Sequence, residues 1–101
     1  SDVELLSMLK EKAIAKTEAA RLLKTCPQTG AAAATVLAGL GDSSWIAAVP
    51  RVFEDTFQRS RLERLLDEKW SAKLEAELRA LPSPNGDFTT WRESMLTKSR
   101  R

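Results

Sequence analysis

The sequence contains no histidine and no tyrosine, and Cys26 is its only cysteine. Without histidine the chain lacks the commonest general base, which excludes serine–histidine–aspartate triads and cysteine–histidine dyads. A single cysteine excludes an internal disulfide framework and any zinc site that needs several Cys or His ligands. We therefore predict that the protein is not an enzyme and that it uses neither a metal nor a cofactor.

Long apolar runs are also missing. The most apolar stretch, residues 31–40, contains Thr35 and Gly39 and is shorter than the roughly 18 residues of a membrane span. Residues 1–4 lack the basic start and apolar body of a signal peptide. An unpaired thiol suits a reducing compartment. These features predict an intracellular protein that does not associate with membranes.

The net charge and the length of the chain limit which partners and how many domains can be predicted. Sixteen Lys and Arg against fourteen Asp and Glu leave a net charge of +2, which is too small to indicate a nucleic-acid partner by itself. The 101 residues have the size of one domain, and a hydrophobic fraction of 43% is sufficient for a core. We predict that residues 1–101 form a single helical domain that belongs to a larger protein.

Helical periodicity dominates the N-terminal half. Residues 3–25 place apolar side chains at helical spacing, either as one helix or as two that meet near Thr17. Pro27 ends this segment because it disfavours the helical conformation at Cys26. Thr29 then has the position of an N-cap for a short apolar helix over 31–38. Residues 42–44 offer caps for a further helix that begins at Trp45.

The segment from residue 50 to residue 81 contains no glycine and no internal proline, and its apolar positions follow a helical period. An unbroken helix of this length would run ~48 Å, whereas a compact domain of this size is only ~33 Å across. The stripe slips in phase between Phe57 and Leu62, and Ser60 with Glu63 has the spacing of a capping box. This favours two helices, about 50–58 and 61–81, over one continuous helix.

The C-terminal part contains the clearest loop, over residues 82–87. A last helix follows near 88–98, started by Asp87 or by the pair Thr90 and Glu93. Together the segments predict an all-α fold. It is a compact bundle of four to six helices with one long amphipathic helix at about 61–81, or continuous from residue 50.

Charged side chains alternate in sign along residues 54–79, which is typical of a solvated helix face rather than a catalytic carboxylate pair. Three pairs stand four residues apart, at helical contact distance: Arg64 with Glu68, Lys73 with Glu77, and Glu75 with Arg79. Cys26 lacks a histidine to activate it, so we interpret it as a packing or incidental thiol.

The long amphipathic helix suggests a function, because it exceeds what its own domain can easily cover. We predict a non-catalytic protein–protein interaction module that binds a helix of another protein, or a second copy of itself, through one apolar stripe. The candidate partner-binding residues are Phe57, Leu62, Leu66, Trp70 and Leu74.

The alternative is a nucleic-acid-binding accessory domain. Residues 92–101 carry an excess of basic side chains beside Trp91, an arrangement that suits contacts with phosphates and stacking on a base. The candidate residues for this function are Arg59, Arg61, Arg64, Arg92, Lys98, Arg100 and Arg101.

Overall fold

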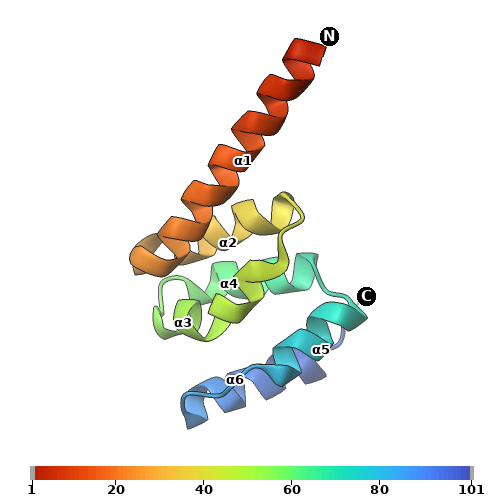
Figure 1. The fold of residues 1–101 in the computed structure, drawn as a ribbon. Helices are drawn as coiled ribbons and strands as arrows, with labels where there is room; N and C mark the ends of the chain where they lie inside the picture. The colour runs from red at the N-terminus through yellow and green to blue at the C-terminus, as the bar shows by residue number, and fades with distance from the viewer. Residues whose placement is uncertain (1, 101) are drawn as a thin grey trace.

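The computed structural model describes residues 2–100, which form six α-helices and two 3₁₀ helices and contain no strand (Figure 1). The α-helices are α1 (Asp2–Thr25), α2 (Gly30–Gly39), α3 (Val49–Glu54), α4 (Arg59–Glu68), α5 (Ala72–Ala80) and α6 (Gly86–Thr97). The 3₁₀ helices are η1 (Pro27–Thr29) and η2 (Ser43–Ala48). The predicted all-α bundle is therefore confirmed.

The predicted long helix over 61–81 is wrong, because the chain turns between α4 and α5. Ser71 takes an extended conformation there, and its side chain accepts a hydrogen bond from the backbone N–H of Leu74 at 3.0 Å. An N-cap of this kind satisfies a free amide of the first helical turn and so allows a new helix to start. The pair Ser60 and Glu63 lies instead inside α4, which begins one residue earlier, at Arg59.

The predicted helix over 50–58 also ends early. α3 stops at Glu54, and Asp55 becomes extended. The carboxylate of Asp55 accepts a hydrogen bond from the backbone N–H of Phe57 at 2.9 Å, which holds the turn into α4. Such a local side-chain-to-backbone bond competes with helix continuation.

The first helix, by contrast, is continuous. At Thr17, where a break was one of two alternatives, the hydroxyl donates to the carbonyl oxygen of Ala13 at 3.0 Å and stays within the helix. The helix has no glycine or proline over its whole length and consists largely of strong helix formers. Ser1 and Glu4 have the sequence spacing of a capping box, and Ser1 lies outside the described residues.

Two N-caps differ from the sequence expectation and one matches it. Thr29 donates its hydroxyl to the carbonyl oxygen of Cys26, and α2 is capped from a distance: the buried Gln58 accepts from the Ala31 N–H at 3.2 Å. Asn85 caps α6 by accepting from the Phe88 N–H at 2.9 Å. Asp42, one of the three candidates at 42–44, caps η2 by accepting a hydrogen bond from the Ser44 N–H.

The helices stack in three layers, with α1 and α2 at one end, α3 and α4 in the middle, and α5 and α6 at the other end (Figure 1). Small residues of α2 permit close packing. A Cβ at Gly30 would lie only 3.1 Å from a methyl group of Val52. Phe53 links the middle layer to α6, with its ring centroid 5.6 Å from that of Phe88 and 4.9 Å from that of Trp91.

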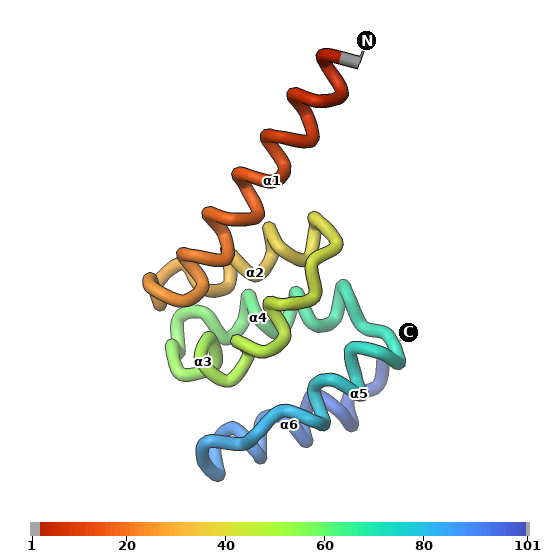
Figure 2. Tube along the Cα trace, viewed as in Figure 1, coloured from red at the N-terminus to blue at the C-terminus, as the bar shows by residue number. Residues whose placement is uncertain are grey.

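One part of the molecule leaves this stack. The N-terminal half of α1 projects away from all other helices (Figures 1 and 2). The Cα radius of gyration is 14.9 Å, against ~13 Å for a compact domain of about 100 residues. The longest dimension is 50 Å. The projecting segment accounts for this elongation, and residues 3–15 are called the arm below.

Candidate functional site

The predicted partner-binding stripe does not form a surface. Leu62 and Leu66 are 0% exposed and Leu74 is also buried. α4 packs against α2 and α3 and thereby turns Leu62 and Leu66 into the core, and Leu74 of α5 is buried in the same core, so these three leucines are not open to a partner. Trp70 is half-buried and lies under the guanidinium of Arg100, 3.6 Å from its ring centroid.

Phe57 is the one member of the stripe that is open to solvent, with 88% of its surface exposed. It belongs to the turn between α3 and α4 and not to either helix. The five residues therefore occupy different environments, and the structure does not bring them together on one face.

Two of the predicted nucleic-acid-binding arginines are used to hold the fold. Arg59 donates to the carbonyl oxygen of Phe53 at 2.7 Å, and its guanidinium lies 3.9 Å from the centroid of the Phe53 ring. Arg92 donates to the carbonyl oxygen of Leu81 at 2.5 Å, and its guanidinium lies over the ring of Phe88. These contacts close the ends of α3 and α5.

The basic C-terminus is likewise engaged within the molecule. Lys98 and Arg100 both bind the carboxylate of Asp67, at 2.6 Å and 2.9 Å. The hydrogen bond from Lys98, supported by Arg100, holds the pKa of Asp67 below its ordinary value against the opposing effect of burial. The pair fastens the segment after α6 onto α4. Arg101 lies outside the described residues.

Arg61 and Arg64 are the remaining candidates, and both are exposed on α4. They line a shallow hollow of about 350 Å³ together with Thr35 of α2 and Glu68. The structure thus brings two of the seven basic residues to a common open surface, and it commits at least four of the others to intramolecular contacts. Binding to nucleic acid stays a prediction.

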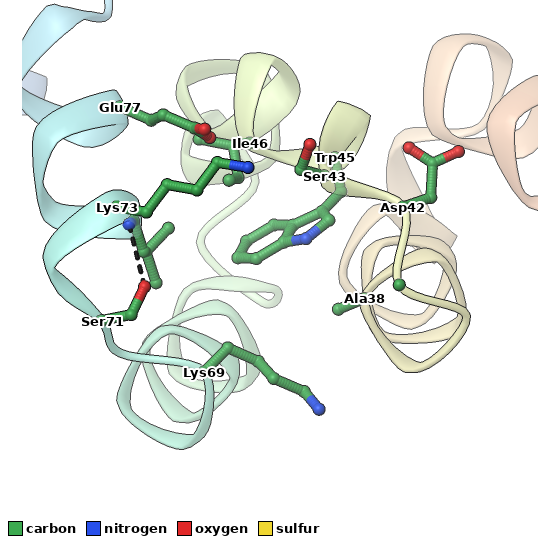
Figure 3. A pocket seen from close by; sticks show the side chains of 11 residues that line it. Ala38, Asp42, Ser43, Trp45, Ile46, Lys69, Ser71, Lys73 and Glu77 are labelled. Carbon is green, nitrogen blue, oxygen red and sulfur yellow. Dashed lines mark hydrogen bonds between the residues drawn. The ribbon is translucent and has the colours of Figure 1, made fainter.

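A second hollow, of about 360 Å³, lies between η2 and α5 (Figure 3). Trp45, Ile46 and Leu74 form its apolar part. Its charged lining consists of two lysines and two carboxylates: Lys69, Lys73, Asp42 and Glu77. Because these charges balance, the hollow has no net preference for an anion or a cation. Among residues 2–100, no three His, Cys, Asp or Glu side chains come together in a group that could hold a metal.

The arm is the most unusual surface of the molecule. Eight large apolar residues of the described chain are exposed, and six of them lie on the arm, with 56–76% of their surface open. They are Val3, Leu5, Leu6, Met8, Leu9 and Ile14. Monomeric proteins rarely leave contiguous apolar surface uncovered unless it is used for binding.

The arm begins where the packing of α1 ends. Ala19 and Leu23 are buried against the body of the molecule, chiefly against α2. One turn closer to the N-terminus, Lys16 pairs with Asp42 at 3.3 Å. Every residue from 3 to 18 is exposed, so the buried packing of α1 against the body begins only at Ala19.

The leucines of the arm share one side of the helix. At 3.6 residues per turn, Leu5, Leu6, Leu9 and Ala13 fall within an arc of about 100°; this set is called the arm face. The periodicity of residues 3–25 had indicated an apolar side. The sequence pattern gave no signal that this side stays exposed in the part of the chain that the structure describes.

No family model, no curated protein and no solved structure matches this chain. Within the described residues, none of the helices combines the length and the apolar character needed to cross a membrane.

Proposed function

We propose that the protein is a non-catalytic interaction module that binds another protein chain, or a second copy of itself, through the arm face. The observation that supports this proposal is the concentration of exposed large apolar side chains on a helix that projects from the fold. Leu9 stands four residues after Leu5 and three after Leu6, and anchors spaced three and four residues apart on one helix are typical of helices that bind in an apolar groove.

The anchoring of α1 favours such binding. An isolated helix of about 13 residues is marginal in water because its first turn is costly to form. In this protein the second half of α1 is already helical and packed on α2, so the arm is extended from an existing helix. Its helical shape is thus prepared before a partner arrives, which reduces the ordering cost of association.

The fold of the rest of the molecule, called the body, does not depend on the arm. The core residues come from α1 after residue 18, from α2 to α6 and from η2. A change on the arm face should therefore alter binding and leave the fold intact, which makes the proposal testable by substitution.

The test uses a fluorescent amphipathic peptide with leucine at the a and d positions of three heptads and glutamine on the flanks. Titration of the intact protein into the peptide at nanomolar concentration measures binding, and light scattering measures self-association. We expect binding or a concentration-dependent dimer, and a loss of at least tenfold in Leu6→Asp/Leu9→Asp.

Val36→Asp/Phe57→Asp is the matched control, because it places the same two negative charges on exposed apolar residues of the body. A protein that stays monomeric and binds no peptide would contradict the proposal. So would an equal loss of binding in the control and in the arm variant.

A further inference from the structure

The charges of the arm are sorted by side. Glu4, Glu11 and Glu18 stand seven residues apart and so line one side of α1. The arm face lies on the opposite side. Lys10 borders it beyond Leu6, and Lys12 borders it beyond Leu5. The arm face is therefore flanked by one lysine on each side, with Ile14 beyond Lys10 and Met8 beyond Lys12, and the acidic side chains lie at its back.

This arrangement acts against pairing of two arms. In a parallel pair, the Lys10 edge of one copy would face the Lys12 edge of the other. In an antiparallel pair, each edge would face its own counterpart. Lysine meets lysine in both orientations, and like charges placed side by side weaken association and exclude wrong partners.

The overall charge of this segment does not favour an anionic lipid surface. Residues 2–18 contain four acidic side chains and three lysines. Electrostatic binding to anionic lipid grows with the number of basic residues near the surface, so a segment without net positive charge gains little from it. Lysine stems can, however, cover apolar surface while their ammonium groups reach carboxylates at the rim of a protein groove.

On the basis of the proposed function, we propose that the arm binds a protein helix or groove whose apolar surface is flanked by aspartate or glutamate, in preference to a second copy of this chain. The leucines of the arm face supply the apolar contact. Lys10 and Lys12 make the binding selective for such a partner, because they form ion pairs only where acidic side chains flank the partner's apolar surface.

The experiment compares three labelled peptides that share leucine at a and d and carry glutamate, glutamine or lysine at every flanking position. The intact protein should bind them in the order glutamate, glutamine, lysine, with about a tenfold difference between the first and last in low salt. The difference should shrink toward unity in about 1 M salt, where the Debye length is only ~3 Å.

Charge reversal sharpens the test. Lys10→Glu/Lys12→Glu should invert the order of the three peptides. Lys69→Glu/Lys73→Glu makes the same change in net charge at exposed positions of the body, and it should leave the order unchanged.

The outcomes separate this inference from the proposed function. Equal binding of the three peptides, or a dimer that is lost in Leu6→Asp/Leu9→Asp, would overturn the inference and leave the proposed function standing. A monomer that binds none of the peptides would overturn both. Vesicles of phosphatidylcholine and phosphatidylserine test the rival surface: binding to them without binding to the glutamate peptide would also overturn the inference.

Discussion

The arm and α4 are similar in sequence and opposite in environment. Each carries leucines at helical spacing between charged residues. In α4 the leucines at 62, 65 and 66 are all buried, whereas Leu5, Leu6 and Leu9 of the arm are all exposed. An amphipathic pattern therefore shows that a helix face favours burial, but it does not show what covers that face.

The cause of the difference is geometric. α1 and α2 are joined by the short η1 turn and lie against each other, but α1 has 24 residues and α2 only 10. At 1.5 Å per residue, α2 reaches along less than half of α1. The chain then turns at Gly41, whose φ of 77° is readily adopted by glycine, and Asp42 pairs with Lys16. α4, by contrast, packs against α2 and α3, and its Glu63 accepts a hydrogen bond from the indole N–H of Trp91 in α6 at 3.1 Å.

A leucine-to-alanine substitution should lower the free energy of unfolding much more in α4 than in the arm, and this is the largest difference that we expect. Leu66→Ala removes a fully buried side chain and is expected to lower the free energy of unfolding by about 2–5 kcal/mol. Leu9→Ala removes an exposed one and should change it by less than about 0.5 kcal/mol. Urea denaturation followed by circular dichroism measures both. Similar losses in the two variants would show that the arm packs on the body in solution.

We expect a smaller loss of stability when the ion pairs that join the segment after α6 to Asp67 of α4 are removed. Asp67→Asn should cost about 1–2 kcal/mol at pH 7, because Arg100 is largely buried and loses its carboxylate. The pKa of Asp67 is lowered in the folded state. Its contribution is therefore complete above the unfolded pKa of about 3.9 and is lost as the pH falls through the lower folded value.

The pH dependence provides the check on this substitution. The difference in unfolding free energy between the two proteins should be constant from about pH 7 to 5 and shrink below about pH 4. Glu93→Gln changes an exposed carboxylate of α6 and serves as the control. A difference that persists undiminished in acid would contradict an ion-pair origin.

The last prediction concerns the local stability of the arm, where the free energy of opening should be the smallest. Its backbone amides should exchange with solvent much faster than those of α4, because the arm is exposed and adds no residue to the core, and such a helical segment opens locally. Hydrogen exchange followed by NMR measures this, and Leu65 and Leu66 are the reference amides. Addition of the glutamate-flanked peptide should slow exchange in the arm and leave the body unchanged. Arm amides as slow as those of α4 would contradict the prediction.

Several features of the fold followed from the sequence alone. Periodicity identified the segments that contain the α-helices, Pro27 ended the first one, and Asp42 was among the three candidate caps at 42–44. The break before Ser71 was missed because a serine with a helical segment on each side gives only a weak local signal. The cap on α2 was not predictable locally, since Gln58 reaches it from 27 residues away.

The candidate site depended more strongly on tertiary structure. The sequence indicated apolar helix faces and basic residues, but Leu62 and Leu66 became core and Arg92 and Arg100 became structural contacts. The arm face became visible only when the covering elements were placed in space.

The amino-acid sequence by itself determined that this protein is built from helices, which segments contain them, and that it lacks histidine chemistry. Those properties depend on neighbours a few residues apart. Tertiary structure alone decided which apolar faces are covered, because coverage depends on the lengths and directions of helices that are distant in the chain. The short α2 beside the long α1 is the reason why one set of leucines forms a core and another remains open to a partner.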